Sequence, residues 1–205
     1  ETWHCSADLS KLEDVKKFVD GAAAHFGGVD ILVSNAGGPP PGEFDDFKDD
    51  DWYLAFDLSV MSAVRLVDAV LPHMKGRGYG RIIFLLSTSV REPIDNLLLS
   101  NVMRPAVAGL SKSLARNLAK DGILVNVVAP GTILTDRVRQ RRQIVADKNN
   151  ISLDEALESA AGEIPLKRLG EPDEFGAIVG FLASPEASYV SGGYYPVDGA
   201  RLRGI

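Results

Sequence analysis

The sequence predicts an open α/β domain in which helices cover both faces of a parallel sheet, giving three layers. Short apolar runs of strand length alternate with longer stretches whose apolar residues recur at helical spacing. Most of these short runs end in glycine, proline, serine or asparagine, which are the residues of loops. Regular alternation of strand and helix favours parallel strands joined by right-handed crossovers, a doubly wound arrangement. The chain has 205 residues, 45% of them hydrophobic, so we expect one core and a single domain over 1–205.

The chain is expected to begin with the end of a strand and then a helix. Residues Glu1 to Cys5 have the pattern of a strand end, followed by a short polar loop. Ser10 is followed three residues later by Glu13, the spacing of a capping box, so a helix is predicted from Ser10 to about His25. The glycines at 27 and 28 would end this helix.

The middle of the chain alternates strands with two long helices. Apolar runs predict buried strands at Ile31 to Ser34, Ile82 to Leu86 and Val125 to Val128. One long helix is predicted from about Asp49 to Met74, and a second carries Ser100 and ends near Ala119.

The last third of the chain departs from this alternation. Residues 132–169 form a polar, mostly helical excursion that is too long for an ordinary connection, so we interpret it as a substrate loop or lid. Glu171 and Pro172 begin another helix, with proline near its first position, and Tyr194 to Val197 forms a last strand. We expect this strand and the three before it to be neighbours in one parallel sheet.

Composition narrows the class of partner. A net charge of -6 and a sequence pI near 5.1 argue against a surface for nucleic acid or anionic lipid. No run approaches the roughly 18 apolar residues of a membrane span. One cysteine excludes an internal disulfide, and three scattered histidines show no metal-ligand spacing, so no metal is expected. We therefore expect a small-molecule substrate and a cytoplasmic, reducing setting.

A serine after a central strand and two polar residues on the next helix form the candidate site. Ser87 ends the second predicted strand, and Ser100 and Arg104 follow it on the helix at positions i and i+4. Residues four apart share a helix face, and open α/β sheets bind ligands at the carboxyl ends of their strands. We expect the three side chains to meet at one ligand site.

In this arrangement the chain resembles the short-chain dehydrogenase/reductases, most closely their β-ketoacyl-carrier-protein-reductase-like members. The resemblance covers essentially the whole chain and includes Asn35-Ala36-Gly37, Asn126 to Gly131, and Val197-Asp198-Gly199 in the family's order. It implies a Rossmann-like fold, NAD or NADP as cofactor, hydride transfer with a carbonyl or alcohol substrate of the 3-oxoacyl type, and a homodimer or homotetramer. It also implies cofactor contacts from Asp8, Asn35, Ala36, Gly37, Arg104, Pro130, Gly131, Ile133 and Thr135.

The catalytic positions depart from the family pattern. The family has Asn, Ser, Tyr and Lys where this chain has Ser59, Ser87, Ser100 and Arg104. A tyrosine of pKa near ~10 can be tuned toward neutrality by a nearby lysine, whereas a serine is far less acidic. An arginine, with a pKa above about 12, keeps its proton. Two interpretations follow: a reductase with an atypical site, in which Ser87 binds the substrate oxygen, or a catalytically silent cofactor-binding or regulatory relative.

The beginning of the chain departs as well. The family opens with two βα units of about 30 residues each, which include a glycine-rich turn for the cofactor, and the chain has no counterpart to them. The predicted strand at Ile31 would then be an unpaired apolar edge. We therefore expect the chain to be part of a longer protein, and the sequence leaves the choice between NAD and NADP open.

Charged residues near the candidate site offer further candidates. Glu92 and Asp95 follow Ser87 in a loop and either donate a proton to substrate or are simply solvated. The excursion carries a second group. Its arginines either hold an anionic tail such as a phosphopantetheine or CoA phosphate, or form a solvated helix face; they are Arg137, Arg139, Arg141 and Arg142.

Overall fold

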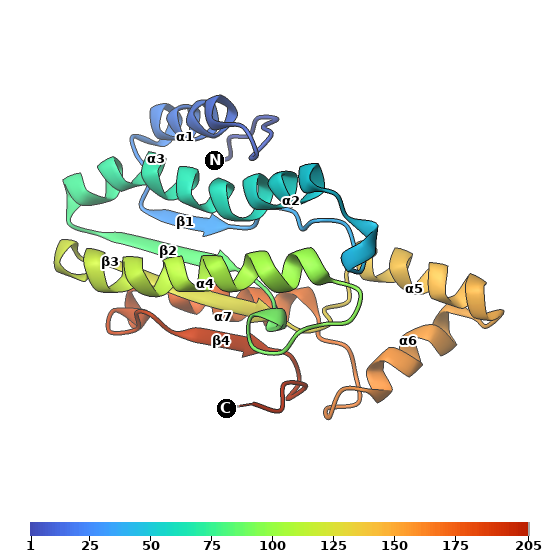
Figure 1. Cartoon of the computed structure of the whole chain (residues 1–205). Coiled ribbons are helices and arrows are strands. Elements are labelled where there is room, and N and C mark those ends of the chain that lie inside the picture. The colour runs from blue at the N-terminus through green and yellow to red at the C-terminus, as the bar shows by residue number, and fades with distance from the viewer. Residues whose placement is uncertain (205) are drawn as a thin grey trace.

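A computed structural model describes residues 1–204 and contains one sheet of four parallel strands. The strands lie side by side in the order of the chain, β1 (Ile31–Ser34), β2 (Gly80–Leu85), β3 (Ile123–Pro130) and β4 (Tyr194–Val197), as Figure 1 shows. The predicted set of four neighbouring parallel strands is confirmed, and β3 continues two residues beyond Val128, to Pro130. Over residues 1–204 no helix combines the length and hydropathy needed to cross a membrane.

Helices cover both faces of this sheet. They are α1 (Leu12–Phe26), α2 (Asp49–Phe56), α3 (Ser62–Arg77), α4 (Leu98–Leu118), α5 (Asp136–Asn149), α6 (Leu153–Gly162) and α7 (Pro172–Ala183). Helices α3 and α4 lie on one face with α1 packed on α3, and α7 lies on the other (Figure 1). Side chains alternate accordingly along β2: Ile82 and Phe84 join the core under α3 and α4, and Ile83 joins the core under α7. The predicted three-layer, doubly wound class is confirmed.

Strand β1 is buried on one face only, which corrects the expectation of a fully buried strand. Leu32 lies in the core, but Ile31 and Val33 are 44% and 42% exposed. The reason is that α7, on their side of the sheet, packs mainly on β2 and β3.

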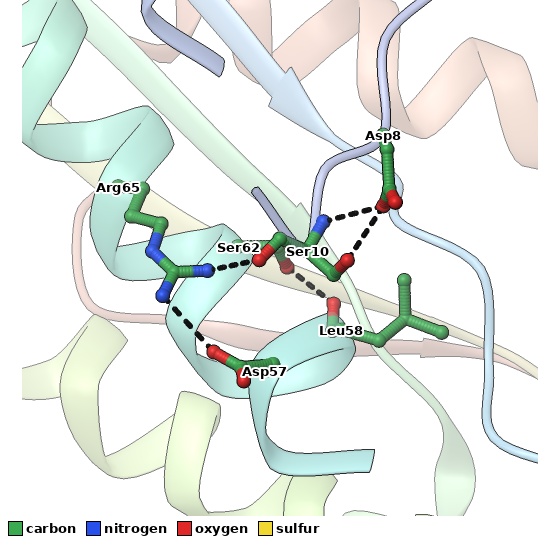
Figure 2. A network of polar contacts seen from close by, with 6 residues as sticks. All are labelled: Asp8, Ser10, Asp57, Leu58, Ser62 and Arg65. Atoms are coloured by element: carbon green, nitrogen blue, oxygen red, sulfur yellow. Dashed lines mark hydrogen bonds and ion pairs between the residues drawn. The ribbon is translucent and has the colours of Figure 1, made fainter. Parts of the chain in front are cut away.

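The amino-terminal segment differs from the sequence prediction. Residues 1–8 form no strand, and α1 begins at Leu12 without the capping box that Ser10 and Glu13 predicted. Instead the Ser10 hydroxyl donates to the Asp8 carboxylate at 2.6 Å, and the Ser10 N–H donates to the same oxygen at 3.0 Å (Figure 2). An aspartate two residues before a serine readily closes such a turn, and here it occupies the side chain that the cap would have used.

The same segment is tied to the long helical region of residues 49–77. The Arg65 guanidinium donates to the Ser10 carbonyl and to the Asp57 carboxylate, as Figure 2 shows. Asp57 begins a π-helical turn, Asp57–Met61, that joins α2 to α3. The predicted long helix is therefore helical without a gap from Asp49 to Arg77 but contains one π-helical turn, beside which the Ser62 hydroxyl donates to the Leu58 carbonyl.

The excursion at 132–169 consists of α5, α6 and their connections, as its helical pattern predicted. It projects beyond the carboxyl ends of the strands in Figure 1 and has a small core of its own, which includes Ala160, Ile164 and Leu169. Its two ends are joined by backbone hydrogen bonds, from Leu134 N to Gly170 O at 2.7 Å and from Gly170 N to Thr132 O at 3.1 Å. The excursion is thus a helical pair with a closed base.

Candidate functional site

A cleft of about 630 Å³ lies at the carboxyl ends of the strands, between α4 and α5. Five of the predicted site residues line it: Ser87, Ser100, Arg104, Pro130 and Gly131. They come from segments far apart in the chain, because parallel strands bring all their carboxyl ends to one edge of the sheet. The volume is in the range of small-molecule sites.

Ser87 follows β2 and begins the short 3₁₀ turn Thr88–Val90. Its Oγ accepts a hydrogen bond from Ser89 N at 3.0 Å, which fixes the hydroxyl oxygen at the end of the strand. In the described part of the chain the hydroxyl donates to no acceptor, so its hydrogen can serve a ligand. A hydroxyl whose hydrogen is free in this way can donate to a substrate oxygen.

Tyr194 of β4, which the sequence analysis did not single out for the site, holds the main chain at Ser87 in place. Its hydroxyl donates to the Ser87 carbonyl at 3.0 Å, and the Arg91 guanidinium lies 4.8 Å from its ring centroid. Burial raises the pKa of Tyr194 to about 12, with a smaller opposing effect from Arg91 and a reinforcing one from Asp198. Tyr194 therefore stays neutral near pH 7 and positions Ser87. A tyrosine at the start of a short strand carries no sequence mark of this role.

Ser100 and Arg104 share one face of α4 and both line the cleft, as their spacing predicted. Arg104 Nη1 donates to the Leu85 carbonyl at 3.1 Å, and a Cβ added to Gly38 would lie 3.4 Å from Nη2. Its Nε is buried and has no hydrogen-bond partner among residues 1–204. Burial, and to a smaller extent the charge of Arg137, lowers the pKa of Arg104.

Ser59 is not brought to the cleft with the other three. It is 7% exposed and lies in the π-helical turn, which packs on α4, and its Oγ has no hydrogen-bond partner in the part of the chain that the structure describes. It does not line the cleft. The structure therefore groups Ser87, Ser100 and Arg104 in the cleft and places Ser59 outside it.

The predicted cofactor residues fall into two groups. Asn35, Ala36 and Gly37 follow β1, and a Cβ added to Gly37 would meet no atom within 4 Å, so the backbone there is open to a ligand. Gly38, the next residue, lines the cleft beside Pro130 and Gly131. Open backbone at strand ends, next to an Arg104 Nε that lacks an acceptor, fits the ribose and amide end of a nicotinamide cofactor.

The remaining predicted cofactor residues have other partners in this structure. Thr135 Oγ1 caps α5 by accepting from Val138 N at 3.4 Å. Ile133 is buried and forms an isolated bridge with Gly170. The Asp8 carboxylate accepts two hydrogen bonds from Ser10, which lower its pKa. None of these three lines the cleft.

The loop between Ser87 and α4 places one of its two acidic residues at the cleft. Asp95 lines it, whereas Glu92 lines only a neighbouring groove of about 680 Å³. Asn101 of α4 fixes this loop, donating to the Ile94 carbonyl at 2.9 Å and accepting from Ile94 N at 3.1 Å. Over residues 1–204 no cluster of His, Cys, Asp and Glu side chains is suited to a metal ion.

The fold and the cleft define a doubly wound α/β domain with a ligand site at the carboxyl ends of its parallel strands. The chain belongs to the short-chain dehydrogenase/reductase family. Residues 1–200 match the family model described as enoyl-(acyl carrier protein) reductase.

Relatives and solved structures agree with this assignment. The NADPH-dependent reductase BacG of Bacillus subtilis is 35% identical over 179 residues, covering 87% of this chain and 69% of BacG. Dehydrogenase/reductase SDR family member 4 of Bos taurus is 36% identical over 195 residues, covering 95% of this chain and 67% of the relative. The structure of L-sorbose reductase from Gluconobacter frateurii, complexed with NADPH and L-sorbose, superimposes with a TM-score of 0.94 at 35% identity, covering 98% of this chain and 76% of that one.

Proposed function

We propose that this protein is an NAD(P)-dependent oxidoreductase that interconverts a carbonyl and an alcohol, with a substrate of the 3-oxoacyl type and an atypical active site. One observation carries the proposal: Ser87, Ser100 and Arg104 converge in a single cleft beside the Pro130 and Gly131 backbone. The names of relatives support it, since BacG is an NADPH-dependent reductase and the sorbose reductase structure contains NADPH.

Residues at the strand ends would hold the cofactor. Open backbone at Gly37 admits close approach of the cofactor, and Arg104 offers donors to its hydroxyl or phosphate oxygens. A bound nicotinamide would supply hydride to the carbonyl or accept it from the alcohol. Fluorescence titration of the intact protein with NADPH and NADH tests this step, with Arg104→Met as the variant that should weaken binding. Failure of both cofactors to bind at millimolar concentration would remove the oxidoreductase proposal.

The side chains of the cleft bind and orient the substrate, but none of them is the tyrosine that serves as the acid in the family. The Ser87 hydroxyl donates to the substrate oxygen, and Arg104 holds a positive charge at the ends of β1 and β2. Neither Ser100 nor Arg104 releases a proton near pH 7. The proton would therefore come from the solvent of the cleft, either directly from water or by way of Asp95, an exposed carboxylate that lines the cleft. We expect slow turnover of ordinary ketones as a result.

The alternative is a catalytically silent relative that binds cofactor or regulates a partner. The observation that favours it is the same replacement, Ser100 and Arg104 in the positions where the family resemblance implies tyrosine and lysine. An assay of NADPH and NADH oxidation across a panel of ketones and β-ketoesters separates the two. Cofactor binding without turnover of any substrate supports the silent relative.

We further propose that the excursion at 132–169 covers the substrate and that the protein is a homodimer or homotetramer. Helix α5 lines the cleft, so closure of the helical pair over it would exclude water. Slower proteolysis within the excursion on adding cofactor is the expected result, and an equal rate argues against a lid. Exposed apolar residues on α2 and α4 support assembly through these helices: Tyr53, Leu54, Phe56 and Val102. The oligomeric state can be measured by comparing the sedimentation of the wild-type protein with that of Leu54→Lys.

A further inference from the structure

We infer that the cleft selects carbonyl substrates that carry a carboxylate or phosphate group, and that Arg137 and Arg141 of α5 bind this group. The inference rests on the proposed function, because it names the class of substrate that the same site takes. It concerns the wall of the cleft opposite Ser87 and Ser100, which the proposed chemistry leaves unused.

Helix α5 directs its arginines into the cleft. Arg137 and Arg141 are four residues apart and line the cleft together with Arg142, whereas Arg139 does not line it. The apolar side of α5 faces the protein, because Ala146 is buried and Val138 packs against the small core of the excursion. Arg137 and Arg141 line the cleft and remain exposed to solvent, so an anionic group entering the cleft can reach their guanidinium groups.

The cleft is strongly positive in an acidic protein. Its lining contains five arginines and one carboxylate, Asp95, although the whole chain has a net charge of -6. Within residues 1–204, Arg201 is paired with Glu163 at 3.3 Å, but Arg104, Arg137, Arg141 and Arg142 form no ion pair. Composition alone would not produce such a cluster.

The arginines repel one another in the absence of an anion. Burial is the larger cause and the charge of Arg137 the smaller cause of a lowered pKa at both Arg104 and Arg141. Arg104 Nε also lacks an acceptor. An anionic group would relieve the repulsion and accept hydrogen bonds in the forked geometry that guanidinium groups offer to carboxylate and phosphate.

Matched pairs of probes test the inference. Pyruvate, acetoacetate and levulinate differ in the separation of carboxylate and carbonyl, and each has a neutral methyl ester of the same skeleton. Dihydroxyacetone phosphate and dihydroxyacetone form the corresponding phosphate pair. Calorimetric titration, with and without saturating NADPH, should show at least one anion binding about tenfold or more tightly than its neutral partner. The pair that shows it distinguishes carboxylate from phosphate as the group recognised.

Variants on α5 locate the effect. Arg137→Gln with Arg141→Gln should reduce the affinity of the preferred anion to that of its neutral partner, and Arg139→Gln on the same helix should leave it unchanged. In the wild-type protein the preference for the anion should also fall as the salt concentration rises. This measurement does not depend on whether a variant folds. Each measurement is made on the intact protein.

Equal affinity for every anion and its neutral partner would overturn the inference, as would an equal loss in Arg139→Gln. A double variant that loses NADPH affinity but keeps the anion preference would also overturn it, since the arginines would then serve the cofactor. Cofactor titration is a separate measurement. Anion preference without any cofactor binding would remove the proposed oxidoreductase function and leave the anion site standing.

Discussion

The Tyr194 hydroxyl donates to the main-chain carbonyl of Ser87 at 3.0 Å, linking β4 to the end of β2. The two strands are not neighbours, because β3 lies between them in the sheet. The hydrogen bond therefore holds Ser87, which lines the cleft, from a strand two places away in the sheet. It connects the last element of the fold to the candidate catalytic serine.

Removal of this hydroxyl should weaken both the fold and the placement of Ser87. We expect Tyr194→Phe to lower the free energy of unfolding by about 1 kcal/mol, the net contribution of one hydrogen bond. Urea unfolding near pH 7 measures it. Tyr189→Phe is the matched control, because Tyr189 is fully exposed and should change stability little.

The partly buried Tyr194 hydroxyl should also make the free energy of unfolding depend on pH in alkaline solution. Burial raises the pKa of Tyr194 to about 12 from its ordinary value of 10.0, so between these values the unfolded chain loses the proton first. Wild-type stability should then fall as pH rises through this range, and Tyr194→Phe should lack that component. A difference in unfolding free energy between the two proteins that stays constant from pH 9 to 12 would contradict this assignment.

Gly131 should tolerate no side chain. A Cβ added there would lie 2.7 Å from the Asp198 Cα and Cβ, and Gly131 N donates to the Val197 carbonyl at 2.9 Å, so the backbone cannot easily move away. We expect Gly131→Ala to destabilise the protein by about 1–3 kcal/mol. Gly37→Ala is the control, since an added Cβ there would meet no atom within 4 Å. Thermal unfolding of both variants compares them.

The ion pair at the base of the excursion should give an acid-dependent contribution. The Arg168 guanidinium, followed by the hydrogen bond from Glu171 N, lowers the pKa of Glu174 to about 2. Because this pKa lies below the ordinary 4.5, the stabilisation is present above pH 4.5 and lost as pH falls toward 2. Glu174→Gln should lower the urea midpoint near pH 7, and its difference from wild type should shrink over that range. Arg168→Gln, which removes the partner of Glu174, should show the same trend.

Much of the fold could be predicted because its signals are local. Apolar runs and their terminating loop residues located all four strands, and Glu171 with Pro172 marked the start of α7. The errors arose where a nearby competitor changed the outcome. Asp8 accepts hydrogen bonds from Ser10 and so removes the predicted cap, and a π-helical turn at Asp57–Met61 lies within the predicted long helix, where apolar periodicity gave no sign of it.

The candidate site was partly predictable for the same reason. The spacing of Ser100 and Arg104 placed both on one helix face, and the end of β2 placed Ser87 beside them. Tyr194 acts through a contact with a segment distant in the chain, and Asn101 acts through side-chain hydrogen bonds to the nearby Ile94 backbone; one sequence shows neither. Among the excursion's arginines, periodicity could not tell which side of α5 faces the cleft, because the helix has charged residues on several sides.

The cleft has Ser100 where the family has its tyrosine acid, and restoring the tyrosine tests how that difference arose. If Ser100 and Arg104 reflect loss of an ordinary reductase site, Ser100→Tyr with Arg104→Lys should place a phenol and an ammonium on the cleft face of α4. General acid catalysis contributes about 10² to 10⁴ in rate, so NADPH oxidation with a β-ketoester should rise detectably above wild type. Ser59→Asn should add little in rate, because Ser59 is buried in the π-helical turn and does not line the cleft, and it should cost stability.

If the present residues instead have a chemistry of their own, the wild-type protein should already reduce some carbonyl compound, and Ser87→Ala should abolish that activity. Asp95→Asn should then slow turnover far more than Glu92→Gln, since Asp95 alone of the two lines the cleft. Both residues lie in the same loop and both substitutions remove one negative charge, so the comparison isolates the effect of position relative to the cleft. Wild-type turnover that survives both substitutions unchanged would show that neither carboxylate supplies the proton, and would leave cleft water, held near Ser87 and Arg104, as its source.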